Sequence, residues 1–228
     1  MKRKLIVTGA SSGLGAHLCK RAAEAGFEII GLSRTRPEAP GLDWRHCDVS
    51  DADSVKSAVS DLRRDERLFG LINAAGIAAM NLTIATPPET VHRIVAVNLL
   101  GTIYCSALIG KWLARRGTGR IINFSTLAVP LAIKGESVYA ASKAGVETFS
   151  RAFAREMGDF GVTVNVIAPG PIDTKLIAKV PKANVDGIID RQLIRRMGTL
   201  EDVWRIAAFL LSDDSDMVTG DVFHVGGA

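Results

Sequence analysis

Short apolar runs alternate along the chain with longer segments in which apolar positions repeat at helical spacing. The runs are rich in Val and Ile and lack a strict alternation of apolar with polar residues, which is typical of strands buried on both faces of a parallel sheet. They cover residues 5–7, 27–32, 68–72, 120–124, 162–167 and 222–225. We therefore interpret these runs as buried strands.

The segments between the runs have the spacing of amphipathic helices. Val55, Ala58, Val59 and Leu62, for example, fall at positions i, i+3, i+4 and i+7, so they share one helix face. Strands that alternate with helices form βαβ units with right-handed crossovers. The pattern predicts an α/β fold: one doubly wound, Rossmann-type domain with a mostly parallel sheet of about seven strands and helices on both faces.

Two stretches depart from this regular alternation. Residues 35–45 contain Pro37 and Pro40, and residues 174–197 form a long connection after Pro169-Gly170-Pro171. Long connections in compact domains often carry function. We expect a single domain over residues 1–228, with a short substrate lid around 174–197.

The composition and charge of the chain agree with a globular domain. The 228 residues are 47% hydrophobic and 23% charged, with a net charge of +4, which is ordinary for a globular domain. The densest basic pairs, Arg63-Arg64, Arg115-Arg116 and Arg195-Arg196, lie far apart in the sequence. We interpret them as solvated helix faces and expect no nucleic-acid partner.

The cysteines and histidines do not form a ligand pattern. The chain has no CxxC or HExxH motif. Its cysteines and histidines are Cys19, Cys47, Cys105, His17, His46, His92 and His224. We expect free thiols in a reducing cytoplasm and no catalytic metal. We also expect no membrane association, because no segment approaches the roughly 18 apolar residues of a membrane span.

A glycine-rich loop follows the first predicted strand and precedes a helix-forming segment. Gly9 permits a tight turn, Gly13 lets the backbone approach a pyrophosphate, and Gly15 lets the helix pack close to the strand. The free N–H groups at the helix start supply donors and partial positive charge. The loop residues expected to bind a dinucleotide are Gly9, Ser11, Ser12, Gly13, Leu14 and Gly15.

The end of the second predicted strand indicates which dinucleotide is bound. An acidic residue about 20 positions beyond the loop holds the ribose 2′-hydroxyl of NAD. Here that place falls to Ser33, with Arg34 next. A carboxylate would repel a 2′-phosphate, whereas a guanidinium would bind it in bidentate fashion. This pair favours NADP(H), although Arg34 could also be a solvated residue at a strand end.

The chain resembles the short-chain dehydrogenase/reductase (SDR) family over nearly its whole length. The matching segments stand in the family's order: the loop Thr8–Gly15, Asp48-Val49, Asn73-Ala74-Ala75-Gly76, Asn98, Ser125-Thr126, Tyr139-Ala140-Ala141-Ser142-Lys143 and Pro169-Gly170. Any one of them could arise by chance, whereas seven in order could not.

The resemblance implies further contacts to the cofactor. Asp48 and Val49 would meet the adenine, and the segment from Asn73 to Gly76 would lie under the adenosine ribose. Asp48 could instead be a turn or cap residue, and Asn73 a strand-end turn. The remaining contacts implied by the resemblance, including those to the nicotinamide, are Ala74, Ala75, Pro169, Gly170, Ile172 and Thr174.

Tyr139 and Lys143 stand at i and i+4, which places them on one face of a helix. A tyrosine hydroxyl has an ordinary pKa near 10, and we expect a nearby Lys⁺ and the oxidised nicotinamide to lower it. Tyr139 would then exchange a proton with the substrate oxygen. A purely structural Tyr–Lys contact is the alternative, which the glycine loop disfavours. Lys143 would also hold the nicotinamide ribose.

The resemblance completes the catalytic set with Asn98 and a hydroxyl-bearing residue. Asn98 would anchor a water that relays protons to Lys143, or satisfy helix carbonyls as a buried Asn. Many relatives have a serine thirteen residues before the tyrosine, and here Thr126 occupies that place. Its branched Cβ stiffens χ1 and adds a methyl group. We choose Thr126, with Ser125 in reserve.

The sequence therefore predicts an NADP(H)-dependent oxidoreductase that acts on a small-molecule carbonyl or secondary alcohol. A 3-oxoacyl thioester is one candidate, although Asp159 and Phe160 stand where reductases of carrier-bound substrates tend to have a basic residue. The resemblance also implies a homodimer or homotetramer. The alternative is a dinucleotide-binding sensor or scaffold protein of the same fold without turnover.

Overall fold

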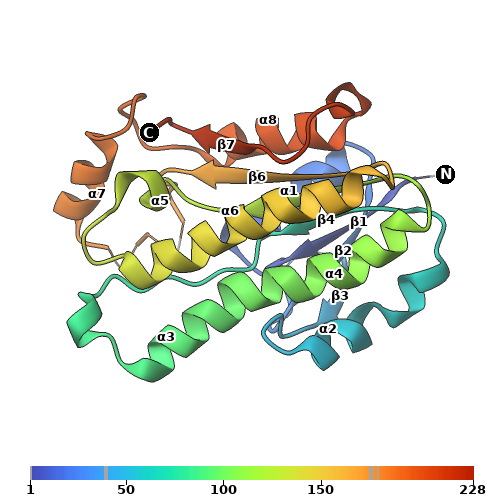
Figure 1. Cartoon of the computed structure of the whole chain (residues 1–228), viewed down its shortest axis with the longest axis horizontal. Helices are drawn as coiled ribbons and strands as arrows, with labels where there is room; N and C mark the ends of the chain where they lie inside the picture. Colours follow the sequence, from blue (N-terminus) through green and yellow to red (C-terminus); the bar gives the residue numbers. More distant parts are fainter. Residues whose placement is uncertain (1, 39–40, 175–176, 179) are drawn as a thin grey trace.

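The computed structural model describes residues 2–38, 41–174, 177–178 and 180–228, and its strands form one parallel sheet (Figure 1). The strand order is β3-β2-β1-β4-β5-β6-β7, and every pairing is parallel. The predicted doubly wound α/β fold is confirmed. The strands are β1 (Lys4–Thr8), β2 (Glu28–Ser33), β3 (Asp43–His46), β4 (Leu68–Asn73), β5 (Gly119–Phe124), β6 (Val162–Pro169) and β7 (Val222–Val225).

One strand has no counterpart among the apolar runs. Strand β3 pairs with β2 from Ile30↔Asp43 to Ser33↔His46, within and just beyond the stretch that we had interpreted as irregular. It lies at the edge of the sheet, and its side chains are half-buried or exposed. Its sequence Asp-Trp-Arg-His therefore carries no run of buried apolar residues, which is the signal that marks the other strands.

Helices α2 (Ala52–Val59), α4 (Gly101–Ala114) and α6 (Ser137–Gly158) cover one face of the sheet. They pack against the alternate residues of the strands that point to that face, such as Leu71 and Ile121. Helices α4 and α6 approach closely at Gly110, where a Cβ would lie 2.8 Å from the Phe153 ring. This packing fixes α6, which carries Tyr139 and Lys143, against the sheet.

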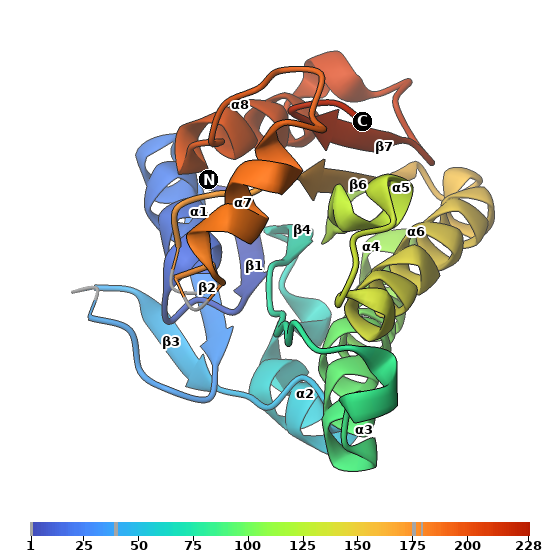
Figure 2. The ribbon, with the colours of Figure 1, turned by 90° about the vertical axis from the view of Figure 1, so that its left-hand side faces the viewer.

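Helices α1 (Gly13–Glu24) and α8 (Leu200–Leu211) cover the opposite face (Figure 2). Leu18 of α1 and Trp204 of α8 are buried in the same apolar core as Val7 and Ile122. Helix α8 begins with a capping box, in which Thr199 accepts a hydrogen bond from the backbone of Asp202 and the Asp202 carboxylate accepts one from the backbone of Thr199. Such a box satisfies two backbone donors that the helix leaves free.

The longest apolar helix runs through three elements: α3 (Pro88–Val95), a π-helical turn η3 (Ala96–Leu100) and α4. It spans 27 residues with a mean hydropathy of 1.6 in its most apolar window, long and apolar enough for a membrane span. This differs from our expectation that no segment approaches that limit. Half of the window is buried inside the fold, and packing in the core is a sufficient reason for its apolar character.

The short elements lie in the connections. At the edge where the strands end lie α5 (Ala128–Leu131) and α7 (Lys182–Ile189). Hydrogen bonds join α7 and the segment after α5 to the loop that carries η2 (Thr83–Ala85). The Asn184 side chain reaches the sulfur of Met80, and the backbone N–H of Asn81 donates to the carbonyl of Gly135 at 2.8 Å. The two remaining elements are η1 (Ser60–Arg64) and η4 (Asp213–Ser215).

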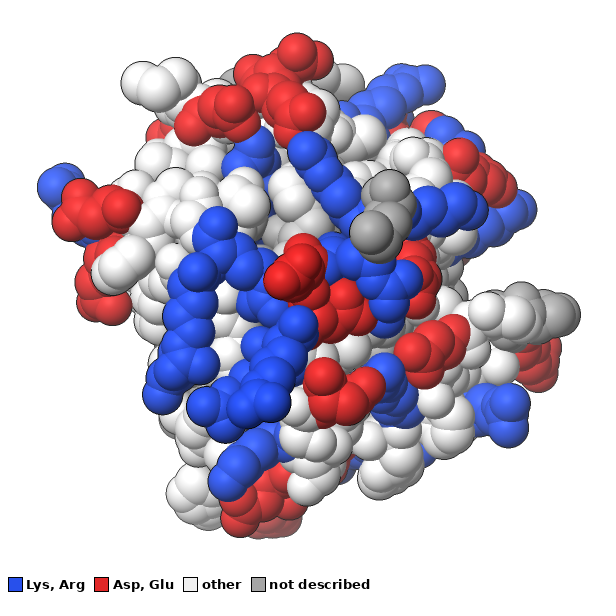
Figure 3. All heavy atoms as spheres, turned by 90° about the vertical axis from the view of Figure 1, so that its right-hand side faces the viewer, with Lys and Arg blue, Asp and Glu red and all other residues white. Residues whose placement is uncertain are grey.

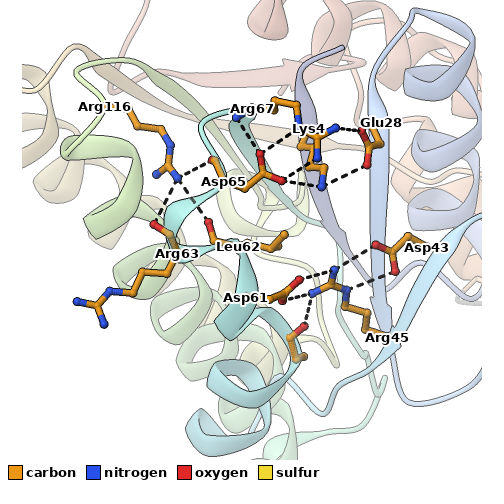
Figure 4. A network of polar contacts seen from close by, with 11 residues as sticks. Lys4, Glu28, Asp43, Arg45, Asp61, Leu62, Arg63, Asp65, Arg67 and Arg116 are labelled. Atoms are coloured by element: carbon orange, nitrogen blue, oxygen red, sulfur yellow. Dashed lines mark hydrogen bonds and ion pairs between the residues drawn. The ribbon is translucent and has the colours of Figure 1, made fainter. Parts of the chain in front are cut away.

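The opposite edge, where the strands begin, is held by a network of ion pairs. Lys4, which is buried at the start of β1, lies 2.6 Å from Asp65 and 3.3 Å from Glu28. Arg67 binds the same two carboxylates, and Arg116 donates to the backbone carbonyl of Asp65 at 2.6 Å (Figure 4). The start of β1 is thus tied to the start of β2 and to the turn before β4.

Basic and acidic side chains gather on this face of the molecule (Figure 3). The fold brings together two of the arginine pairs that are distant in sequence, because Arg116 donates to the backbone carbonyls of Leu62, Arg63 and Asp65. Burial lowers the pKa of Arg116. Part of the positive charge on this face is therefore engaged in holding the chain together.

We expect Asp65→Asn to lower the free energy of unfolding at pH 7 by about 1–3 kcal/mol, since it leaves buried Lys4 with one carboxylate. Burial alone would raise the pKa of Asp65, but hydrogen bonds from Arg67 and Lys4 hold it well below its ordinary value. A depressed folded-state pKa gives stability that is present above the unfolded pKa and lost as the pH falls. The difference between variant and wild type should therefore shrink below about pH 4.

Urea unfolding at pH 7 and at pH 3 to 4 measures this difference. The matched control is Asp61→Asn, which removes an exposed partner of Arg45 and should cost less than about 1 kcal/mol. Equal losses for the two variants, or a difference independent of pH, would contradict the assignment.

Candidate active site

A cavity of about 490 Å³ opens at the edge where the strands end. Ligands bind at this edge in doubly wound sheets. All but two of the site residues predicted from the sequence line it, the exceptions being Asn73 and Asn98. The predicted site residues that line it are Gly9, Ser11, Ser12, Gly13, Leu14, Gly15, Ser33, Arg34, Asp48, Val49, Ala74, Ala75, Gly76, Thr126, Tyr139, Lys143, Pro169, Gly170, Ile172 and Thr174.

The glycine loop has the geometry that a pyrophosphate requires. Gly9 has φ +70°, and a Cβ there would lie 2.9 Å from the backbone nitrogen of Ala75. A Cβ at Gly15 would overlap the carbonyl oxygen of Gly9. Ser12 at the N-cap of α1 makes no side-chain capping hydrogen bond, so the first N–H groups of the helix are available to an anion. These features fit a bound dinucleotide.

Ser33 and Arg34, at the end of β2, have different surroundings. The Ser33 hydroxyl donates to the carbonyl of Thr35 at 2.8 Å and accepts from the Trp44 indole N–H at 2.9 Å. Its side chain therefore holds the loop after β2 against β3. The Arg34 side chain lines the cavity and is exposed, which leaves its guanidinium able to reach a ligand.

Asp48 combines a turn role with a place in the cavity. Its carboxylate accepts hydrogen bonds from the backbone N–H of Ser50 at 3.0 Å and from the Ser50 hydroxyl at 2.6 Å. Hydrogen bonding by Ser50, with a smaller contribution from the charge of Arg34, lowers the pKa of Asp48. The carboxylate is thus kept ionised as an acceptor beside Val49.

Asn73 lies below the cavity, inside the core. Its amide donates to the Asn123 side-chain oxygen at 2.8 Å and to the Ser106 hydroxyl at 3.0 Å, and Asn123 donates in turn to Ser150. This buried network joins β4, β5, α4 and α6. Asn73 therefore supports the strand ends from beneath, as a fully buried amide must to satisfy its donors.

Asn98 lies in the π-helical turn η3 and is fully buried. Its side chain makes reciprocal hydrogen bonds with the backbone of Ile77, both at 2.9 Å, and also donates to the Ser142 hydroxyl at 3.1 Å. A π-turn re-aims side chains within a helix and often marks a functional site. Here it joins the loop after β4 to α6, one residue before Lys143.

Tyr139 and Lys143 both line the cavity from α6, as their spacing predicts. Burial raises the pKa of Tyr139 to about 12, the negative charge of Glu136 adds to this rise, and the Thr126 hydroxyl acts in the opposite direction. Burial lowers the pKa of Lys143 to about 8, and its ammonium donates to the Phe124 carbonyl at 2.9 Å.

In this structure the pKa of Tyr139 is raised and not lowered, contrary to the effect expected from Lys143, while the effect expected from an oxidised nicotinamide stays a prediction. Burial determines the direction for both groups, because low polarity disfavours the charged form of each. The ammonium of Lys143 is directed to the end of β5. Tyr139 is consequently held in its protonated form, which is the form of a proton donor.

The structure also places the two hydroxyls between which the sequence left a choice. The Ser125 hydroxyl is buried and donates to the Glu147 carboxylate at 2.5 Å. The Thr126 side chain lines the cavity near Tyr139. Residues 124 to 126 all line the cavity and meet α6 at Lys143, Glu147 and Tyr139 respectively. The Ser125 hydroxyl is engaged by Glu147, whereas the Thr126 hydroxyl lies near Tyr139.

Several lining residues were not identified from the sequence. Glu136 stands three residues before Tyr139, and this i, i+3 spacing on the same helix end could have indicated it. The apolar wall comes from separate segments, and no local pattern joins them before the chain is folded. Among the residues not identified are Ile77, Ala78 and Val97, whereas Leu127 and Ile133 belong to a segment that the sequence indicates as an apolar pocket wall.

The predicted lid region, 174–197, contains helix α7. Ile177, Val180 and Ile188 of this region line the cavity, and Ile188 packs with Leu127 and Leu131. The buried Gln192 side chain donates to the carbonyls of Ile194 and Arg196. Residues 175, 176 and 179 of the predicted lid lie outside the described residues.

Comparison with known proteins gives matches over nearly the whole chain. The family model described as enoyl-(acyl carrier protein) reductase matches residues 9–227. The short-chain reductase protein NovJ of Streptomyces niveus is 32% identical, over 97% of this chain and 92% of that protein. The 3-oxoacyl-[acyl-carrier-protein] reductase FabG of Escherichia coli is 31% identical, over 97% and 95% respectively.

Solved structures give the same result at the level of the fold. The aldohexose dehydrogenase of Thermoplasma acidophilum superimposes with a TM-score of 0.89 and 27% identity, covering 99% of this chain and 93% of that chain. Levodione reductase also gives a TM-score of 0.89 at 27% identity, with coverage of 99% and 96%. The chain therefore belongs to the short-chain dehydrogenase/reductase family of oxidoreductases, as its ordered motifs predicted.

Proposed function

We propose that this protein reduces a ketone to a secondary alcohol with NADP(H) as its cofactor, Tyr139 acting as the proton donor. The observation that carries the proposal is the convergence of Tyr139, Lys143 and Thr126 in the same cavity as the glycine loop. Burial raises the pKa of the Tyr139 phenol, so the phenol is protonated, which is the form that donates a proton in reduction.

The preference for NADP(H) rests on Arg34. Its exposed guanidinium lines the cavity at the end of β2, where a ribose 2′-phosphate would lie. Ser33 has its hydroxyl engaged with Trp44 and Thr35, and it offers no carboxylate to repel that phosphate. The oxidoreductase names of the related proteins support the same type of reaction.

The residues of the chain divide the chemistry of proton transfer among them. The cofactor, when bound, supplies a hydride to the carbonyl carbon. Tyr139 donates its phenolic proton to the carbonyl oxygen, so that the C=O double bond becomes a C–OH group. Thr126 orients that oxygen by hydrogen bonding, and Lys143, on the same face of α6 as Tyr139, would hold the nicotinamide ribose.

The substrate end of the cavity is walled by apolar side chains, among them Leu127, Ile133 and Ile188. Such a wall suits the acyl chain of a 3-oxoacyl thioester, the substrate class in the names of the FabG relatives. The names of the similar structures point to other carbonyl or alcohol groups, on a levodione and on an aldohexose. All of these share a carbonyl or secondary alcohol at the reacting centre.

We expect Tyr139→Phe to lower kcat for NADPH-dependent ketone reduction by about 10²- to 10⁴-fold, because no other donor replaces the phenol. NADPH affinity should stay within a few-fold of wild type. The measurement is NADPH oxidation with 3-oxoacyl thioesters, cyclic ketones and sugar ketones.

Tyr104→Phe, a change of the only other tyrosine in the sequence, is the matched control and should retain activity. Undiminished turnover by Tyr139→Phe would refute the proposed mechanism. Binding of NADPH without reduction of any carbonyl would favour a sensor or scaffold protein instead.

Arg34→Ala should weaken NADPH binding by about 10- to 100-fold, the loss of hydrogen bonds to a charged group, and leave NADH binding nearly unchanged. Fluorescence titration of both cofactors measures the two dissociation constants. Arg36→Ala is the matched control, since the Arg36 guanidinium lies over the Trp44 ring at 5.8 Å and does not line the cavity. If Arg34→Ala weakens both cofactors equally, the 2′-phosphate assignment is wrong.

Thr126→Val should lower kcat by about 10²-fold, a typical loss for one hydrogen bond in the transition state, whereas Ser125→Ala should retain kcat within about threefold. The valine keeps the shape of threonine and removes only the hydroxyl. Ser125→Ala removes the hydroxyl that donates to Glu147, so thermal stability should fall in that variant. The reverse order of the two kcat values would transfer the role to Ser125.

A further inference from the structure

Among the described residues that line the substrate end of the cavity, one carries a carboxylate. Glu136 lines the cavity together with Ile133 and Tyr139, and its charge raises the pKa of Tyr139. The carboxylate therefore lies near the proposed proton donor. The other described acidic residue of the lining, Asp48, belongs to the adenosine end, beside Val49 and Ser50.

The backbone around Glu136 is fixed from both sides. Its N–H donates to the Ile133 carbonyl at 3.2 Å, and its own carbonyl accepts from Ala140 at 2.7 Å. The preceding Gly135 carbonyl accepts from the N–H of Asn81 at 2.8 Å. These bonds anchor the residue to the start of α6 and to the loop after β4, so the side chain projects from a well-supported position.

Neither capping nor ion pairing accounts for a glutamate here. Glu136 occupies the N-cap of α6 but makes no side-chain capping hydrogen bond, and Ser, Thr, Asp and Asn are the residues that cap best. Within the described residues its carboxylate has neither a hydrogen-bond donor nor an ion-pair partner. Burial raises its pKa, which is a cost that an apolar residue at this place would avoid.

A carboxylate in such a place can bind a donor on the substrate. Its neighbours on the wall, such as Leu127, Ile133 and Ile188, offer no competing donor side chain. Ionised carboxylates accept strong, charge-assisted hydrogen bonds from hydroxyl groups. They also repel anions, which disfavours a ketone with a carboxylate or phosphate at this position.

We propose that Glu136 is a specificity-determining residue, which selects a ketone that bears a hydroxyl group at the position facing its carboxylate. The inference rests on the proposed function, because it concerns the substrate of the same site. It narrows the substrate class from ketones in general to hydroxyl-bearing, uncharged ketones. The hydroxyl donates to Glu136, while the carbonyl oxygen lies at Tyr139 and Thr126.

The test compares hydroxycyclohexanones with methylcyclohexanones substituted at the same ring positions, using NADPH and the full chain. For at least one position we expect wild type to prefer the hydroxyl compound by about tenfold or more in kcat/KM, the size of a hydrogen bond to a charged group. Glu136→Leu should abolish this preference. Glu136→Gln, which keeps one acceptor oxygen, should retain part of it.

Glu66→Leu is the matched control, an exposed glutamate outside the cavity lining, and it should keep the wild-type preference. Melting temperature and NADPH affinity establish that each variant is folded. If Glu136→Leu does not fold, the test is the reduced preference expected of Glu136→Gln, and an undiminished preference in that variant overturns the inference.

A wild-type ratio near one at every position, or an equal ratio in wild type and Glu136→Leu, overturns the inference. A stronger preference for an aminocyclohexanone would assign the carboxylate to a cation and overturn the hydroxyl assignment. If ketones are reduced in a Tyr139-dependent manner while the ratio is insensitive to Glu136, this inference alone fails. If no ketone is reduced, or Tyr139→Phe is fully active, the proposed function fails with it.

Discussion

The arrangement of the site depends on how the end of β5 is attached to helix α6. Phe124 accepts a hydrogen bond from Lys143, Ser125 donates one to Glu147, and Thr126 faces Tyr139. The three helix residues are spaced by four, which places them along one face of α6. Both Ser125 and Thr126 line the cavity, but the Ser125 hydroxyl is held by Glu147. The buried pair thereby engages the Ser125 hydroxyl, which supports the proposal that Thr126 supplies the hydroxyl for a substrate.

Burial of the same helix face sets the protonation of the site. The environment that raises the pKa of Tyr139 lowers that of Lys143, and so both groups are pushed toward their neutral forms. A neutral phenol is the form required to donate a proton to a carbonyl oxygen. Glu136 acts in the same direction on Tyr139. The carboxylate that we assign to substrate selection thus also contributes to keeping the proton donor protonated.

Much of the fold could be predicted from the sequence because its signals are local. The buried strands appear as apolar runs, the glycine loop as a fixed spacing, and the Tyr139/Lys143 pair as one helical turn. Strand β3 escaped because an edge strand such as Asp-Trp-Arg-His needs no apolar run. The direction of the Tyr139 pKa shift was missed for a different reason: spacing reveals a neighbouring lysine but not the depth of burial. The role of Asn73 likewise depends on partners 33 and 50 residues away.

Charged side chains are arranged differently at the two ends of the strands. At the edge where the strands begin, charged groups are paired: Lys4 with Asp65 and Glu28, and Arg67 with the same carboxylates. At the edge where they end, Glu136 and the Arg34 side chain face a cavity. A charge held at a partly buried place without a protein partner is destabilising unless a ligand binds it. The edge where the strands begin thus pairs its charges, whereas the other edge keeps a partly buried Glu136 and an exposed Arg34 available for recognition.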